Sequence, residues 1–201
     1  MSFQYDTSRD FLESVLASRP GLLEGWHRII DFYEQQAAKP YWSDFRNLDI
    51  TAEREAILAW LHGMLRKEPL PESVVAFWLG LFKFMEETSN EESYSLYLVG
   101  CEHYHPDQMD WTAEPVYEPE GRYFIPARLN RLGALLRQHE IDHHDDYCLL
   151  DWILPLAWCA LILDDLIRHH LDKTLLLRSR SRLFVQIGFD DGDYLYLSAI
   201  E

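Results

Sequence analysis

Three residues in the second half of the chain combine the types and the spacing of a metal site. His139, Glu140 and His143 belong to the pentapeptide His-Glu-Ile-Asp-His, so the two histidines are four residues apart. On a helix, that spacing places both imidazoles on one face, and imidazole nitrogen is a common ligand of Zn²⁺. A carboxylate beside the first histidine could then take a proton from a zinc-bound water. This pattern points to metal-assisted hydrolysis.

The pentapeptide resembles the HExxH signature of the zincin metalloproteases. By that resemblance, His139 and His143 bind zinc, Glu140 activates water, and a third ligand comes from later in the chain. A second interpretation of the same residues stays open, because the polar run 142–146 is typical of a solvated loop between two helices. A metal-dependent hydrolase is therefore one alternative function. Zinc is the one cofactor that the sequence suggests, and otherwise we expect none.

A different chemistry is indicated by residues 91–120, which contain eight acidic residues and neither lysine nor arginine. Five tyrosines and tryptophans are interleaved with the acids. Carboxylates steer a cationic partner, while Tyr and Trp supply contact area at low entropic cost. The segment is therefore predicted to bind a basic partner. The predicted contact residues are Glu91, Glu92, Tyr97, Glu102, Tyr104, Asp107, Asp110, Trp111, Glu114, Tyr117, Glu118 and Glu120.

The charge of the whole chain agrees with that prediction. The formal net charge is −16, of which residues 1–90 contribute −5 and residues 91–201 contribute −11. A field of that sign repels nucleic acid and anionic membrane surfaces, and it attracts basic proteins. The alternative is that the acidic surface only keeps a structural or scaffold domain in solution.

Cysteine usage and hydropathy favour a cytoplasmic protein. The three cysteines, Cys101, Cys148 and Cys159, form no CxxC pair and suggest no disulfide framework. The first residues lack the basic start and apolar stretch of a signal peptide. The most apolar stretch, 147–163, is short for a membrane span and is interrupted by a charge and a proline. No nucleophile elbow, P-loop or dinucleotide-binding motif is present, so we expect a protein that is not an enzyme.

One isolated carboxylate requires a partner. Asp151 lies between apolar neighbours, and a buried carboxylate is costly unless it is paired. Arg128, Arg131 or Arg178 could supply the opposite charge. We expect a structural ion pair there rather than a catalytic acid.

The only cluster of bases is Arg178, Arg180 and Arg182, which alternate along the chain. They could bind phosphate, or they could neutralise acids of their own fold. Nearby, Arg168 is four residues after Asp164, a spacing that lets the two side chains pair on a helix.

The elements that would position these residues divide the chain near residue 90. Helices are predicted from Thr7 or Ser8, over 22–33 and from Thr51, each with apolar residues at helical spacing. A fourth is predicted over 71–85, apolar on all sides and therefore buried. A strand is expected over 93–100.

The remaining elements combine strands with two helices. A hairpin is expected around 120–121, a helix over 127–140 and a long buried helix over 145–170 that Pro155 kinks or breaks. A second hairpin is expected over 183–199. The fold class is α+β: a bundle-like half of about four helices, 1–90, packed in one domain, 1–201, with an α+β half, 91–201. That half has a small antiparallel sheet, the long helix and the final β-hairpin.

These patterns favour one function over the others. We expect an acidic cytoplasmic protein that captures a basic protein partner, for which an immunity protein that neutralises a bacterial toxin is the biological example. The hydrolase and the scaffold domain are the alternatives.

Overall fold

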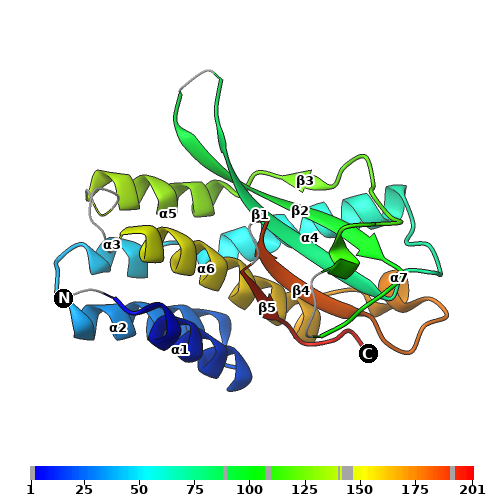
Figure 1. Ribbon diagram of the computed structural model, residues 1–201, viewed down its shortest axis with the longest axis horizontal. Coiled ribbons are helices and arrows are strands. Elements are labelled where there is room, and N and C mark those ends of the chain that lie inside the picture. The colour runs from blue at the N-terminus through cyan, green and yellow to red at the C-terminus, as the bar shows by residue number, and fades with distance from the viewer. Residues whose placement is uncertain (1–2, 88–89, 107–109, 140, 142–146, 191–192) are drawn as a thin grey trace.

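A computed structural model describes residues 3–87, 90–106, 110–139, 141, 147–190 and 193–201. Within these ranges a five-stranded sheet packs with helices, which confirms the α+β class (Figure 1). The helices are α1 (Tyr5–Ala17), α2 (Leu22–Gln36), α3 (Trp42–Arg46), α4 (Ile50–Lys67), α5 (Ala127–Gln138), α6 (Tyr147–His169) and α7 (Lys173–Leu177), with a short 3-10 turn at Asp110–Thr112. The strands are β1 (Ala76–Met85), β2 (Glu92–Cys101), β3 (Tyr123–Phe124), β4 (Phe184–Phe189) and β5 (Tyr194–Tyr196).

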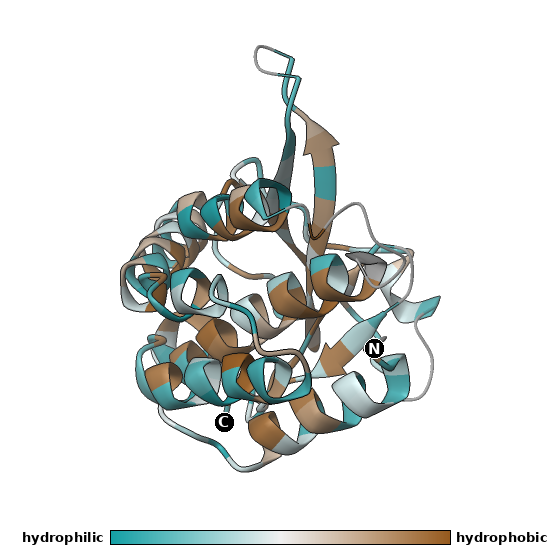
Figure 2. Ribbon diagram, turned by 90° about the vertical axis from the view of Figure 1, so that its left-hand side faces the viewer, coloured by the Kyte–Doolittle hydropathy of each residue, from teal (hydrophilic) through white to brown (hydrophobic). Residues whose placement is uncertain are grey.

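The sheet has the order β3-β2-β1-β4-β5 and is mixed. The central strand β1 runs antiparallel to β2 and parallel to β4, and β4 forms the predicted hairpin with β5. The two faces of β1 differ: Phe77 and Leu79 lie in the main core with the helices, whereas Trp78 lies in a second apolar cluster on the outer face. The ends of β1 and β2 project together from the body of the molecule (Figure 2).

Helix α6 is the centre of the core. It packs against α1, α2, α4, α5 and β4. Trp158 of α6 meets Trp26 of α2 edge to face, with ring centroids 4.9 Å apart, and both rings are fully buried. Within the described residues, no helix combines the length and the apolar composition that a membrane crossing needs.

Pro155 lies inside α6, which continues past it, so of the two predicted effects, a kink or a break, the break is wrong. A proline has no N–H to donate to the carbonyl four residues earlier, here that of Asp151. The Tyr94 hydroxyl of β2 lies 3.0 Å from this carbonyl oxygen and also contacts the Asp151 carboxylate, so its single proton can reach either acceptor. A donor from outside the helix is thus available to the carbonyl that Pro155 leaves without its helical partner.

The largest error of the sequence prediction concerns residues 71–85, where 76–85 form β1 and no fourth buried helix is present. A central strand that is covered on both faces also gives a continuous apolar run, so periodicity cannot separate it from a buried helix. The first half still contains four helices, because the short helix α3 forms between α2 and α4. The helical region ends at Lys67.

Two smaller expectations also fail. The segment around 120–121 is not a hairpin, because Tyr117 pairs with Gly100 and Tyr123 pairs with Tyr97, so both flanks lie along β2. Neither predicted cap begins a helix: α1 starts at Tyr5 without a side-chain cap. The cap of α4 is Asp49, whose carboxylate accepts a bond from the backbone N–H of residue 52.

Candidate functional site

The acids of 91–120 that the structure describes are exposed, but several have bases beside them in space. Four are paired with a base from another part of the chain: Glu91 with Arg137 (3.7 Å), Glu92 with Lys83 (3.7 Å), Glu118 with Arg122 (3.3 Å) and Glu120 with Lys67 (2.5 Å). Among the described residues, Glu102, Asp110 and Glu114 have no lysine or arginine partner. Asp107 lies outside the described residues. The segment is thus free of bases in sequence but not in space.

The predicted aromatic contacts hold the segment against the sheet. Trp111 is 8% exposed and belongs to the outer-face cluster, and Tyr104 stacks on Phe184 with centroids 4.1 Å apart. Tyr117 is buried, and its hydroxyl donates to the carbonyl oxygen of Glu68 at 2.6 Å. These rings therefore stabilise the position of the segment in the free protein.

Exposed apolar side chains lie next to the acids, at positions that the sequence reasoning missed. Tyr123 and Ile125 are 54% and 57% exposed, and Met85 and Val116 are about half exposed as well. Tyr123 belongs to the edge strand β3, and Ile125 follows the last residue of that strand, so the two alternate about Phe124. That alternation is visible in the sequence, but it lies just past the predicted acidic segment.

Two glycines shape the outer face of the sheet. Gly80 of β1 and Gly188 of β4 are register partners in the parallel pair. The Tyr97 ring lies over Gly80, where a Cβ would overlap it, and the Trp78 ring lies over Gly188 in the same way. Larger residues at these two positions would displace the rings.

The rings over the glycines hold a carboxylate. The Trp78 indole N–H donates to the Tyr97 hydroxyl oxygen (3.1 Å), which in turn donates to Asp190 Oδ1 (2.6 Å). Burial, and next the bond to Asp190, raise the pKa of Tyr97 well above its ordinary value. The phenol therefore stays protonated at neutral pH and remains a donor to Asp190.

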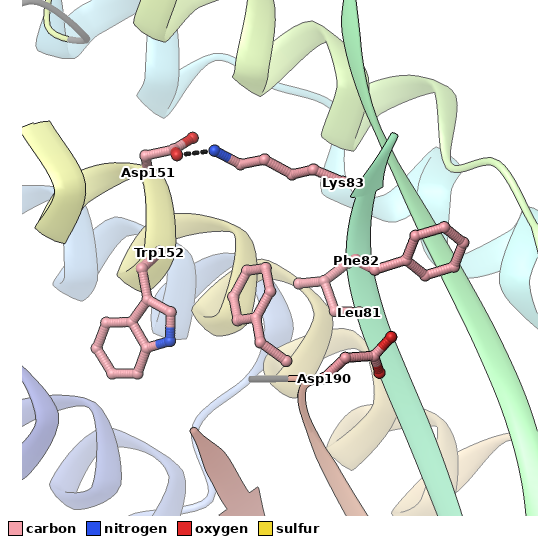
Figure 3. A pocket seen from close by; sticks show the side chains of 7 residues that line it. Leu81, Phe82, Lys83, Asp151, Trp152 and Asp190 are labelled. Carbon is pink, nitrogen blue, oxygen red and sulfur yellow. Dashed lines mark hydrogen bonds and ion pairs between the residues drawn. The ribbon is translucent and has the colours of Figure 1, made fainter. Parts of the chain in front are cut away.

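Asp190 lies where two hollows meet, just past the end of the paired part of β1 and β4. The inner hollow, about 360 Å³, faces α6 (Figure 3), and the outer hollow, about 420 Å³, lies on the outer face of the sheet. Phe82 and Asp190 line both. The inner hollow also includes Lys83, Asp151, Trp152 and Phe189, and the outer one Tyr97, Glu118, Arg122 and Tyr123.

An ion pair lies at one side of the inner hollow. Lys83 of β1 reaches across to Asp151 of α6 (Figure 3), and the Tyr94 hydroxyl also contacts the Asp151 carboxylate. The predicted structural ion pair is confirmed. Its partner is Lys83, however, and none of the three arginines that were suggested. Residue 83 was overlooked because its segment was assigned to a helix.

The arginine cluster binds its own fold. Arg178 donates to the carbonyl oxygen of Leu70 (3.1 Å), and Arg180 donates to those of Pro71 and Leu176. Burial and then the charge of Arg178 lower the pKa of Arg180.

Arg182, the third member of the cluster, pairs with Glu201, which agrees with the second of the two alternatives for these arginines. Asp164 and Arg168 also pair as predicted, at 2.7 Å.

The zinc interpretation depends on residues that the structure only partly describes. Glu140 and His143 lie outside the described residues. His139 follows the last residue of α5, its Nε2 lies 3.0 Å from Asp44 Oδ2, and its ring stacks on Tyr41. No cluster of three potential metal ligands occurs within the described ranges. The metal alternative therefore stays a prediction.

No protein-family model, no curated protein and no solved structure matches the chain. Its function is therefore inferred from its own residues and their geometry.

Proposed function

We propose that the protein is an acidic cytoplasmic binding protein that captures a basic protein partner. The biological example that fits this character is an immunity protein that neutralises a bacterial toxin. Binding would use the outer face of the sheet, its edge at β3 and the acids of 91–120.

The observation that carries the proposal is the distribution of exposed apolar side chains. Seven large ones are exposed among the described residues, and three of them, Val116, Tyr123 and Ile125, lie on the edge strand β3 or in the chain just before and after it. The rings of Phe82, Tyr97 and Tyr123 lie beside them, with centroids 5.9 to 6.2 Å apart. Apolar groups within a polar rim are the anatomy of a protein interface.

The rim is acidic, which selects the class of partner. Glu102, Asp110 and Glu114 are exposed and have no basic partner in the described part of the chain. Their charges add to the excess of acids in residues 91–201. Such a field speeds association with a cationic surface and repels nucleic acid and anionic membrane.

The partner is first isolated by carbodiimide cross-linking, identified and purified. Its affinity for the protein is then measured by calorimetric titration at low and at high salt. The variant Glu102→Gln/Asp110→Asn/Glu114→Gln removes three unpaired charges without breaking an ion pair. We expect about tenfold weaker binding, which corresponds to about 1.4 kcal/mol, and a smaller salt dependence. Reversal of Glu114, Glu118 and Glu120 to lysine should abolish binding, although it also disrupts two ion pairs.

The matched control removes the same number of charges from the helical side. Asp6→Asn/Asp10→Asn/Glu24→Gln changes exposed acids on α1 and α2 and should leave affinity nearly unchanged. An acidic partner, or equal effects of the two triple variants, would contradict the proposal. For the immunity example, cells that make the purified partner should survive only when they also make the protein.

A further inference from the structure

We infer that Asp190 anchors one lysine or arginine side chain of the basic partner, at the junction of the inner and outer hollows. That this side chain belongs to a basic protein rests on the proposed function. The cation site itself can be tested without the partner.

Charge pairing singles out Asp190 among the carboxylates that line the two hollows. Asp151 is paired with Lys83, and Glu118 is paired with Arg122 at 3.3 Å. No lysine or arginine in the described part of the chain pairs with Asp190. A cation that enters either hollow therefore meets one carboxylate whose charge is not already neutralised.

The position of this carboxylate is fixed before a ligand arrives. Its Oδ1 accepts the bond from the Tyr97 hydroxyl at 2.6 Å, and the Trp78 indole holds that hydroxyl in turn. Its other oxygen has no hydrogen-bond donor among the described residues. The absence of a side chain at Gly80 lets the Tyr97 ring lie flat enough to reach Asp190. Preorganisation of this kind reduces the entropic cost of binding.

The walls beside Asp190 suit an organic cation with an apolar stem. Phe82, Tyr97 and Tyr123 surround the outer side, and aromatic faces attract ammonium and guanidinium groups. The chain already uses this chemistry here, because the Arg122 guanidinium lies 4.9 Å from the Tyr123 ring centroid. Hard metal ions such as Ca²⁺ prefer six or more oxygen ligands, and these walls are rings. The methylenes of lysine or arginine would pack on the rings while the charge meets Asp190.

The test uses N-acetyl-lysine methylamide as the probe and N-acetyl-norleucine methylamide, which lacks the ammonium group, as its matched compound. Binding is followed by NMR chemical shifts in the whole protein. For Asp190→Asn we expect the lysine compound to bind about five- to tenfold more weakly, because a charge-assisted hydrogen bond is lost. The norleucine compound should bind weakly and equally to both proteins.

The control variant Asp10→Asn makes the same chemical change on the exposed surface of α1. It should leave lysine binding unchanged. Equal effects of the two variants would show only a general influence of net charge and would overturn the site. Tyr97→Phe keeps the ring but removes the hydroxyl, so lysine binding should weaken severalfold at an unchanged unfolding midpoint. Wild-type affinity in that variant would overturn the positioning by Tyr97.

The purified partner separates the two proposals. If Asp190→Asn loses the lysine compound but keeps full affinity for the partner, the anchoring role is wrong and the proposed function stands. If no basic partner exists while the lysine compound still depends on Asp190, the proposed function fails and the cation site stands.

Discussion

At the scale of single residues, Glu53 shows how one buried carboxylate joins two helices. It lies in the first turn of α4 and is fully buried. Its Oε2 accepts the backbone N–H groups of Arg128 (2.6 Å) and Leu129 (2.8 Å) at the start of α5. These are donors that a helix start leaves without partners. Glu53 therefore caps a helix that begins about 75 residues later in the chain.

This cap should make stability depend on pH. Burial raises the pKa of Glu53, and the N–H bonds offset only part of the shift. The folded state then binds the proton more tightly than the unfolded state does. The free energy of unfolding of the wild type, relative to that of Glu53→Gln, should therefore increase as pH falls from neutral. The increase should level off below about pH 4.5, the ordinary pKa of a glutamate, where both states of the wild type are protonated. Urea titrations across this range measure the difference, and a constant difference would contradict the expectation.

For the candidate site, the sequence shows the residue types but not which of them meet in the fold. The excess of acids was visible because charge is additive along a chain. The pairing of three of those acids was not visible, since Lys67, Lys83 and Arg137 come from other elements, whereas Arg122 lies only four residues after Glu118. Asp190 falls within the hairpin predicted over 183–199, and its importance depends on the Tyr97 ring, which lies two strands away in the sheet.

At the scale of elements, Asn130 of α5 takes the place of a missing strand. Its side-chain amide accepts the backbone N–H of Tyr94 (2.6 Å) and donates to the Tyr94 carbonyl oxygen (3.1 Å). Strand β3 pairs with only two residues of β2, Leu96 and Tyr97, so it does not cover the edge of β2 near Tyr94. The helix thereby covers an edge that could pair with another chain.

Removal of this amide should loosen β2 locally. For Asn130→Ala we expect a loss of about 1 to 2 kcal/mol in the free energy of unfolding, because two buried hydrogen bonds disappear. Hydrogen exchange at the Tyr94 amide should accelerate more than at Gly100, whose N–H binds the Tyr117 carbonyl. The exposed Asn47→Ala is the control and should change neither quantity. Uniform acceleration in the Asn130 variant would argue against a local role.

Elements were predictable where one signal dominated. Helix α5 and the hairpin of β4 and β5 followed from amphipathic spacing and turn residues. Strand β1 was mistaken for a helix because both of its faces are covered, a property of the tertiary fold. Pro155 was expected to kink or break α6. The Tyr94 hydroxyl, which lies near the carbonyl that Pro155 leaves without a helical partner, comes from a strand, so the sequence around Pro155 does not reveal it.

At the scale of the whole molecule, the net charge of −16 should oppose folding by self-repulsion. Salt screens that repulsion. Salt also weakens the exposed ion pairs, but these pairs contribute little to the free energy of unfolding. Added KCl should therefore raise the unfolding temperature by about 2 to 4 °C, equivalent to about 1 kcal/mol. Calorimetry measures this shift, and Glu102→Gln/Asp110→Asn/Glu114→Gln should show a smaller one. A midpoint that falls with salt would mean that ion pairs outweigh repulsion.

The two glycines under the outer-face rings have a consequence for sequence evolution. At Gly80, the nearest atoms that an added Cβ would meet all belong to the Tyr97 side chain, so we expect a larger residue at 80 to be tolerated if a smaller one replaces Tyr97. At Gly188 it would also meet the backbone of 193 and 194, which no change at Trp78 can relieve. Homologous sequences should therefore vary together at positions 80 and 97, while position 188 should remain glycine.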